Sequence, residues 1–369
     1  FDLAAGYPGA VNLCNGEPNF ETPKHIVESA VTALREGRTK YGTEPGLPAM
    51  RQAVANKYIA QFGREYDIDN GMVTLGGVEG IFMSLSAILN PGDEVIIPDP
   101  AYTCYEGQVL LLGGKPVRVP LYEEHGFRLQ PEDLEAAITP KTKALIVTYP
   151  SNPLGAVLDR ADGEALAKVI ARHPIMVISD EVYEKILFDG REHFSLAQIE
   201  DIKDQVLVVN SLSKTYAMTG WRLGYVVGTD KDLMRHMFKM QQAVVSCLPI
   251  FTMQAGADAI SGPQDCVEEM RRHYERRRNL LVDGLKDIPG MKPFKTEGSF
   301  CTFIHLQDFG VSSWELSKEL LVNAGVMTIA GSAFGKMGEG YLRICFANSD
   351  ENILEGVRRI REYIQRRDG

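Results

Sequence analysis

The stretch I-M-V-I-S-D at residues 175–180 is a nearly continuous apolar run that ends in a carboxylate. Two similar runs stand on either side of it, A-L-I-V at 144–147 and V-L-V-V at 206–209. A strand that is apolar at nearly every position is typical of a parallel sheet whose two faces are both covered by helices. The three runs therefore predict the centre of a buried parallel sheet.

Outward from this centre, short β-rich runs alternate with helical patterns from about residue 70 to residue 230. The alternation favours an open, doubly wound α/β domain. We expect a large, mostly parallel, seven-stranded sheet with strands at 72–76, 94–98, 116–120, 143–149, 175–180, 205–210 and 221–227. Helices are expected between them at 80–89, 131–138 and 162–171.

The C-terminal part of the chain has a different pattern. A long helix is predicted over 265–288, because apolar residues recur there at roughly helical spacing, at Val267, Met270, Tyr274, Leu281 and Leu285. Short strands at 300–306 and 341–346 then mix with helices at 314–324 and 351–366. This mixture predicts a smaller α+β domain. We expect the large domain to span 23–282, and the small domain to combine 1–22 with 283–369.

The charge balance argues against a nucleic-acid partner. The chain has 369 residues, of which 24% are charged, and its formal net charge is −10. Binding to a phosphate backbone calls for basic patches. The densest basic run consists of Arg271, Arg272, Arg276, Arg277 and Arg278, and glutamates are interspersed with it. Such mixing predicts a solvated, salt-bridged helix face.

The cysteines and histidines give no metal or disulfide pattern. The six cysteines are irregularly spaced and form no C-x-x-C pair, so we expect reduced thiols in a cytoplasmic protein with no bound metal. The sequence contains neither an apolar run of membrane-spanning length nor a signal-peptide pattern. The first residue is Phe1 rather than Met, so we allow for a native N-terminal stretch that precedes it.

Polar and glycine residues gather at the predicted ends of the strands. In open α/β sheets, ligands bind outside the carboxyl ends of the strands. The residues that follow successive strands are Gly76 and Gly77, Tyr102, Asn152, Asp180 and Lys214. Their shared position predicts one site that holds an anion, a cationic partner and a ring.

Each of these residues also has a plainer interpretation. Gly76, Gly77 and Val78 open a helix and suit a phosphate, although a simple strand-to-helix turn uses the same glycines. Asp180 could cap the next helix or pair with a protonated ring nitrogen. Lys214 could be a surface lysine, or a nucleophile whose pKa is lowered by burial and by the nearby Arg222.

Two further motifs resemble known sites without matching them. S-L-S-K at 211–214 fits the S-x-x-K motif of serine acyl-enzymes, but the partner strings S-D-N and K-T-G do not occur in the chain. G-S-A-F-G-K at 331–336 resembles a P-loop, but it has three residues between its glycines and Met337 after its lysine. We therefore assign neither function.

Taken together and in order, the motifs resemble the class I/II aminotransferases of pyridoxal 5'-phosphate (PLP) fold type I, the group that includes aspartate aminotransferase. The resemblance covers nearly the whole chain. It is carried by N-G-E-P-N-F (15–20), K-Y-G-T-E-P-G-L-P-A-M-R (40–51), S-N-P-L-G (151–155), S-D-E-V-Y (179–183), S-L-S-K-T-Y-A-M-T-G-W-R-L-G-Y (211–225) and Y-L-R-I-C-F-A-N-S (341–349).

The resemblance implies a PLP enzyme that moves the amino group of an α-amino acid to a 2-oxo acid in ping-pong half-reactions. It makes Lys214 the lysine that forms the internal aldimine and then carries the substrate proton. Asp180 would keep the ring nitrogen protonated, so that the ring can act as an electron sink. Tyr183 and Asn152 would bind the ring O3′, and Tyr102 would stack on the ring.

The same resemblance implies the remaining binding residues. The phosphate would be held by Gly77, Val78, Ser211, Ser213 and Arg222, and by Tyr41 from a neighbouring subunit. That last residue implies a homodimer with shared active sites. Arg343 would grip the substrate α-carboxylate as a bidentate pair, with Gly16 and Asn152 beside it.

Departures from the family pattern bear on substrate choice. Val78 stands where some aspartate-acting relatives carry a basic residue, and no second arginine can be assigned to a distal carboxylate. Another PLP carbanion reaction, such as a C–S β-lyase or a γ-elimination, would use the same lysine, aspartate and arginine. A non-catalytic regulatory module would need a basic winged-helix segment, for which the chain has neither the room nor the charge.

Overall fold

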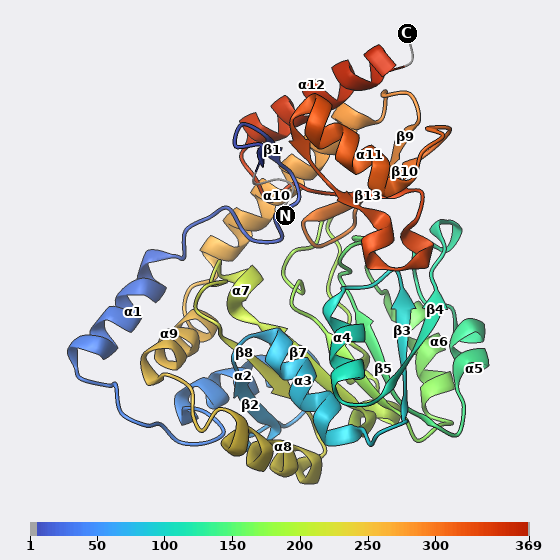
Figure 1. Cartoon of the computed structure of the whole chain (residues 1–369). Helices are drawn as coiled ribbons and strands as arrows, with labels where there is room; N and C mark the ends of the chain where they lie inside the picture. The colour runs from blue at the N-terminus through green and yellow to red at the C-terminus, as the bar shows by residue number, and fades with distance from the viewer. Residues whose placement is uncertain (1–5, 368–369) are drawn as a thin grey trace.

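The computed structural model describes residues 6–367. A large sheet with its helices forms the lower part of the molecule in Figure 1, and a smaller sheet with its own helices lies above it. The predicted small domain also includes residues 1–5 and 368–369, which lie outside the described residues. The helix that joins the two parts is α10 (Asp265–Leu285).

The large sheet has seven strands in the order β2-β8-β7-β6-β5-β3-β4. Strands β7, β6, β5, β3 and β4 are parallel, and β8 is antiparallel to both of its neighbours. The predicted mostly parallel, seven-stranded α/β sheet is thus confirmed. The strands are β2 (Gly71–Thr74), β3 (Glu94–Asp99), β4 (Lys115–Pro120), β5 (Thr142–Thr148), β6 (Met176–Asp180), β7 (Val206–Ser211) and β8 (Gly224–Val227).

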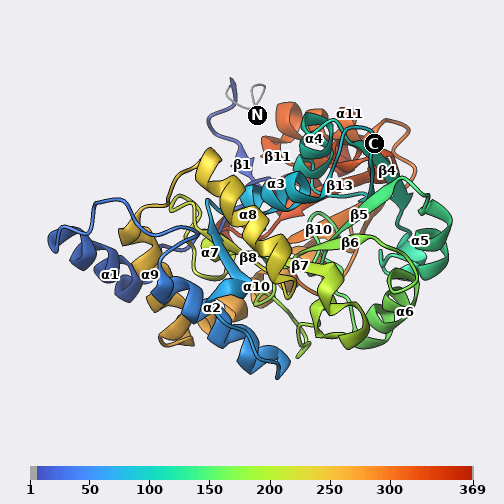
Figure 2. The ribbon, with the colours of Figure 1, turned by 90° about the horizontal axis from the view of Figure 1, so that it is seen from below.

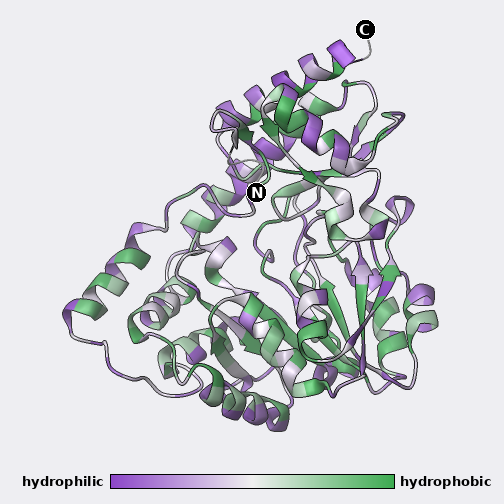
Figure 3. Cartoon of the chain, viewed as in Figure 1, coloured by the Kyte–Doolittle hydropathy of each residue, from purple (hydrophilic) through white to green (hydrophobic). Residues whose placement is uncertain are grey.

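Alternate residues of the central strands enter two different cores. Ile96 packs in a core with α1, α2, α5, α6 and α9, whereas Ile97 packs in a second core with α3, α4 and α8. Figure 2 views these layers from below, and Figure 3 shows hydrophobic strands at the centre with hydrophilic outer helix faces. The helices are α1 (Lys24–Arg35), α2 (Pro48–Phe62), α3 (Gly77–Ile88), α4 (Cys104–Leu111), α5 (Pro131–Ala137), α6 (Arg160–Ile170), α7 (Leu212–Thr215), α8 (Lys231–Val244) and α9 (Ile250–Ser261).

The smaller sheet has the order β12-β13-β10-β9, and a third core lies against it. Val267 of α10 packs in the core of the large sheet, while Tyr274 and Leu281 of the same helix pack in this third core. The N-terminal strand pairs with β11 in this part of the molecule. The remaining elements are β1 (Val11–Asn12), β9 (Met291–Pro293), β10 (Cys301–Leu306), β11 (Val326–Met327), β12 (Ile329–Ala330), β13 (Tyr341–Cys345), α11 (Ser313–Glu319) and α12 (Asp350–Arg367).

Two expectations from the sequence are corrected. Strand β8 begins at Gly224 rather than at residue 221, because Arg222 adopts a positive φ of 52° that interrupts extended backbone. The basic run on α10 is not wholly solvated, because Arg278 is 1% exposed and donates to both Asp189 carboxylate oxygens at 2.7 and 2.8 Å. Its guanidinium also lies 4.9 Å from the Phe188 ring centroid. The arginine side chain therefore contributes to the core.

None of the helices between residues 6 and 367 has the length and apolar character needed to cross a membrane. Within the same range, no cluster of three histidine, cysteine, aspartate or glutamate side chains could hold a metal ion.

Candidate active site

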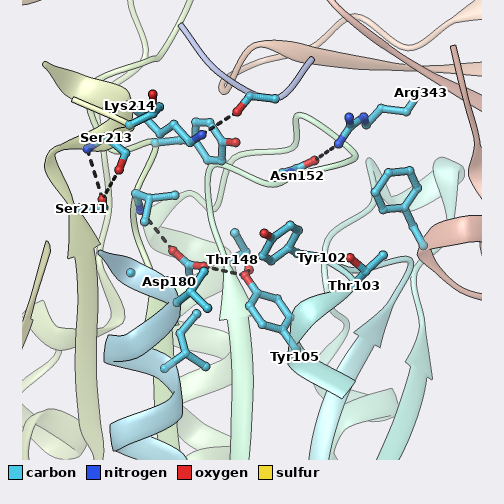
Figure 4. A pocket seen from close by; sticks show the side chains of 18 of the residues that line it. Tyr102, Thr103, Tyr105, Thr148, Asn152, Asp180, Ser211, Ser213, Lys214 and Arg343 are labelled. Carbon is cyan, nitrogen blue, oxygen red and sulfur yellow. Dashed lines mark hydrogen bonds between the residues drawn. The ribbon is translucent and has the colours of Figure 1, made fainter. Parts of the chain in front are cut away.

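A cavity of about 570 Å³ lies at the carboxyl ends of the large sheet's strands, and residues of the smaller sheet also line it. Figure 4 shows Lys214 and Arg343 at opposite sides of this pocket, with Asp180 and Tyr105 below them. The pocket brings together all the predicted site residues except Tyr41: Gly16, Gly77, Val78, Tyr102, Asn152, Asp180, Tyr183, Ser211, Ser213, Lys214, Arg222 and Arg343.

Asp180 is the last residue of β6, and its side chain is held by two donors. Its Oδ2 accepts a 2.6 Å hydrogen bond from the Tyr105 hydroxyl, and its Oδ1 accepts a 3.3 Å bond from the Val182 N–H. Burial raises the pKa of Asp180 to about 6, although the Tyr105 hydrogen bond acts in the opposite direction. A buried carboxylate without an ion pair among the described residues is well suited to receive a cationic ligand group.

Lys214 lies in the short helix α7, directly after β7. Its Nζ donates a 2.6 Å hydrogen bond to the Gly16 carbonyl and lies 5.5 Å from the Phe300 ring centroid. Burial lowers the pKa of Lys214. The structure therefore contradicts the interpretation of Lys214 as a surface lysine, because its amine points into the pocket and is more easily deprotonated than an exposed one.

The N-terminus of α3 forms a cradle for an anion with Arg222 and two serines. Gly76 has a φ of 82°, and a Cβ placed there would lie 2.5 Å from Nη2 of Arg222. Glycine therefore allows the guanidinium to approach the first turn of α3, where free N–H groups carry a partial positive charge. The hydroxyls of Ser211 and Ser213, which are 2.8 Å apart, line the same pocket.

Arg343 lies on β13 and is 5% exposed. Its Nη1 donates to Asn152 Oδ1 at 3.1 Å and its Nη2 donates to the Cys14 carbonyl at 2.8 Å, while its Nε is buried without a partner. No carboxylate among residues 6–367 pairs with it, so Arg343 does not serve a structural acid. Burying a cation with an unused N–H donor destabilises the protein unless a ligand accepts that hydrogen bond. A carboxylate would accept it and also balance the charge.

Two tyrosines predicted to contact a ring differ in their surroundings. Tyr183 is 3% exposed, and burial raises its pKa well above the ordinary value. Tyr102 is half-buried, and its ring meets that of Tyr105 edge-on with centroids 5.6 Å apart. Both side chains line the pocket, which leaves their polar ends available to a ligand.

The sequence interpretation missed Tyr105 and Thr148. The Tyr105 hydroxyl, which binds Asp180, also lies 2.5 Å from Thr148 Oγ1. Tyr105 follows Tyr102 by three residues, so a helix starting there would have indicated it. Thr148 is a polar residue at the end of the apolar strand β5, the same signal that identified Asp180.

Tyr41 lies outside this pocket. Its side chain is 89% exposed, and it lines a separate cavity of about 640 Å³ with the segment 247–251. Tyr41 is therefore not part of the pocket that brings the other predicted site residues together.

The fold and the site together define a PLP enzyme of fold type I, because the glycine and arginine cradle suits a phosphate, Asp180 a ring nitrogen and Lys214 an aldehyde. The family model for aminotransferase class I and II matches residues 8–360, so the chain belongs to that family. It is a PLP-dependent aminotransferase that acts on amino acids and 2-oxo acids.

Individual relatives agree with this assignment. The chain is 42% identical to an aspartate aminotransferase from Pyrococcus abyssi, over 99% of this chain and 94% of the relative. It is 41% identical, over the same shares, to aromatic-amino-acid aminotransferase 2 from Thermococcus litoralis. The crystal structure of an aromatic aminotransferase from Pyrococcus horikoshii aligns with a TM-score of 0.95 at 42% identity, covering 98% of this chain and 96% of its own.

Proposed function

We propose that Lys214, Asp180 and Arg343 are the three residues that carry amino transfer in this enzyme. The supporting observation is their arrangement in one pocket: a lysine of lowered pKa, a buried carboxylate and a buried arginine with an unused Nε. When bound, PLP supplies an electron sink for the bonds of the substrate Cα.

The residues of the chain would divide the remaining work. Lys214 would hold the aldehyde carbon and then move the proton at the substrate Cα, a task that needs a neutral amine at working pH. The Asp180 carboxylate would hold the ring N–H, Tyr183 and Asn152 would bind the ring hydroxyl, and Tyr102 would cover the ring.

The phosphate would be bound by the first turn of α3 and the side chains around it. Backbone N–H groups at the helix N-terminus complement a dianion. Arg222 adds a permanent charge, and it is already held in place by the Thr219 carbonyl at 2.8 Å. The residues proposed for this role are Gly77, Val78, Ser211, Ser213 and Arg222.

Arg343 would bind the substrate α-carboxylate, with Asn152 and Gly16 beside it. The wall near the α-carboxylate site is uncharged and includes Ile329 and Phe334. The basic residues that line the pocket are Lys214, Arg222 and Arg343, and each already has a role. We therefore propose that neutral and aromatic amino donors are used at least as well as aspartate.

We further propose a cytoplasmic homodimer with shared active sites. The exposed Tyr41 ring, which lies beside the segment 247–251, would reach the phosphate of the neighbouring subunit. We also propose that 23–282 forms the large domain and that 1–22 with 283–369 forms the small one. The continuous helix α10 would then connect the cores of both.

Covalent labelling and an amino-acid screen test this function. Borohydride reduction of the holoenzyme, followed by peptide mass analysis, should place the pyridoxyl group on Lys214. Lys214→Ala should retain some cofactor but lose transamination, whereas Lys185→Ala, which removes an exposed lysine, should keep both. A label on another lysine, or release of ammonia from amino acids without any 2-oxo acceptor, would contradict the proposal.

A further inference from the structure

The loop at 331–338 links the smaller sheet to the core of the large one. It contains the G-S-A-F-G-K sequence that resembles a P-loop, and it folds as two short 3-10 turns, Gly331–Phe334 and Lys336–Gly338. The loop joins β12 to β13, yet its Phe334 is 4% exposed and packs in the same core as Ile96 of the large sheet. This segment therefore belongs to one part of the molecule by sequence and to the other by packing.

Asp99, the last residue of β3, accepts hydrogen bonds from the backbone of this loop. It is 4% exposed, and its Oδ2 and Oδ1 accept the N–H groups of Lys336 at 3.2 Å and Met337 at 3.3 Å. Two residues further along the chain, the Ala101 N–H donates to the Phe334 carbonyl at 2.9 Å. The nearby Arg118 forms an ion pair with Glu106 rather than with Asp99.

Gly335 shows how closely the loop and the carboxylate fit. Its φ is 136°, and a Cβ placed on it would lie 1.8 Å from Oδ1 and 2.6 Å from Cγ of Asp99. Both the backbone conformation and the available space therefore require glycine at this position. The backbone of residues 335–337 thus packs closely around the buried Asp99 carboxylate.

The contact between Asp99 and the loop lies close to Arg343, the residue proposed to bind the substrate. The ring centroid of Phe334 is 5.0 Å from the guanidinium carbon of Arg343. Ala333 and Phe334 both line the active-site pocket, whereas Asp99 does not. Strand β12, which leads into the loop, pairs Ile329 with Arg343. Any movement of the loop away from β3 would consequently displace the wall that covers Arg343.

We propose that Asp99 is a positioning residue for substrate binding, which holds the loop 331–338 on the end of β3 and thereby keeps Phe334 over Arg343. The proposal rests on the function assigned above to Arg343. Asp99 acts only through the loop, so its loss should affect substrate affinity and leave the cofactor in place.

The test compares Asp99→Ala, Asp99→Asn and Gly335→Ala with a control in the turn that precedes the same strand. Asp93→Asn is a matched control, because Asp93 precedes the opposite end of β3 and accepts a local N–H from Asn90 at 2.7 Å. Two measurements are made on each holoenzyme: KM and kcat for the amino donor, and the rate at which trypsin cuts after the exposed Lys336.

In Asp99→Ala we expect KM to rise about tenfold with kcat within about twofold, since two backbone N–H groups lose their acceptor. The cofactor absorption band should be unchanged, and cleavage after Lys336 should be faster. Asp99→Asn keeps one acceptor oxygen and should be intermediate, while Asp93→Asn should behave as wild type. Gly335→Ala should reproduce the KM change and the fast cleavage.

The double variant Asp99→Ala/Gly335→Ala provides a further criterion. Because both substitutions break the same contact, their effects on KM and on cleavage should be clearly less than additive. Fully additive effects, or unchanged KM and cleavage in Asp99→Ala, would overturn the proposal. The proteolysis measurement needs no turnover, so it reports on the loop even if the assignment of Arg343 to the substrate carboxylate fails.

Discussion

Tyr105 donates a 2.6 Å hydrogen bond to Asp180, although the two residues come from different elements, helix α4 and strand β6. Tyr105 is 1% exposed and Asp180 is 5% exposed, so water does not compete for this bond. The hydroxyl fixes one carboxylate oxygen and leaves the other with only the N–H of Val182, at 3.3 Å. Tyr105 therefore orients the carboxylate toward the pocket.

We predict that Tyr105→Phe weakens the hold on the cofactor and slows turnover. Without the hydroxyl, the pKa of Asp180 should rise further, because the Tyr105 hydrogen bond is a contribution that lowers it. A more readily protonated carboxyl is a poorer partner for a cationic ring nitrogen, and we expect a loss of about tenfold in cofactor affinity. Equilibrium titration of the apoenzyme with PLP measures it. Thr148→Val, which leaves the bond to Asp180 in place, should have a smaller effect; equal effects would contradict this role.

The second prediction concerns the pH dependence of the cofactor-free protein. Burial raises the pKa of Asp180 from 3.8 to about 6. Between these two values the unfolded chain has already released its proton while the folded chain still holds it. The contribution of Asp180 to the free energy of unfolding of the apoprotein should therefore fall as the pH rises from about 4 to about 6, by about 3 kcal/mol in all.

Asp180→Asn should remove this fall. The difference in the free energy of unfolding between the apo variant and the apo wild type should be larger at pH 8 than at pH 4. The increase should be most of the roughly 3 kcal/mol that a shift of about two pKa units gives, in favour of the variant. Urea unfolding of both apoproteins at the two pH values gives the comparison. With PLP bound the order should reverse, since asparagine cannot pair with a cationic ring. A constant stability difference between the apoproteins across this pH range would refute the prediction.

The sequence predicted the sheet well because burial on both faces leaves a local trace. Strands such as β6 are apolar at successive positions, and the polar residue that ends each run marks the carboxyl edge where ligands bind. The partners of these residues left no such trace. The contacts of Lys214 with Gly16 and of Arg343 with Cys14 span 198 and 329 residues. Such contacts depend on how the two sheets pack, which residue periodicity does not encode.

Arg278 illustrates the same limit for stability. It is the last of three consecutive arginines, so the pattern predicted a solvated helix face, but the helix turns this residue into the core. We predict that Asp189→Ala, which leaves the Arg278 cation buried without its bidentate partner, destabilises the protein by about 2 kcal/mol, less than for a fully buried pair because the Asp189 side chain is 41% exposed. Arg272→Ala, on the exposed side of α10, removes only a surface pair with Glu268 and should cost less than about 1 kcal/mol. Thermal or urea unfolding of the wild-type and variant holoenzymes measures the loss of stability in each variant. Equal costs would show that the burial of Arg278 has no energetic consequence.

The fourth prediction tests whether Tyr41 serves the neighbouring subunit. Tyr41→Phe should keep the fold and the dimer but release PLP more readily. Sedimentation should show a dimer for both the wild type and the variant, and a fully active monomer would contradict shared sites.

Mixed dimers give a sharper test of the same idea. The test uses a heterodimer of Tyr41→Phe and Lys214→Ala subunits, in which a Tyr41 that acts across the interface leaves one site with both substitutions and one site with neither. If Tyr41 acts across the interface, these heterodimers should show cofactor affinity and turnover of the wild-type kind at one site of the two. If Tyr41 acts within its own subunit, no site is intact and no such recovery should appear.

The last prediction concerns Arg343, whose Nε is buried without a partner. A carboxylate and a guanidinium are planar groups that can form two parallel hydrogen bonds, and lysine cannot reproduce this geometry. Arg343→Lys should leave the cofactor absorption band intact. It should lower kcat/KM on the order of 100-fold, equivalent to about 3 kcal/mol of transition-state binding, and by a similar factor for every α-amino acid. Arg358→Lys, on the exposed face of α12, is the matched control and should have no effect.

Steady-state kinetics across a panel of donors check both parts of this prediction. The ranking of donors should survive in Arg343→Lys, because we assign side-chain discrimination to the uncharged wall that includes Ile329 and Phe334 rather than to Arg343. Neutral and aromatic donors should be at least as good as aspartate in the wild type, since no further cation lines the described pocket to receive a second carboxylate. An unchanged kcat/KM in Arg343→Lys would remove the role of Arg343. A strong preference for aspartate would instead show that a cation from outside this pocket, such as one from a neighbouring subunit, completes the substrate site.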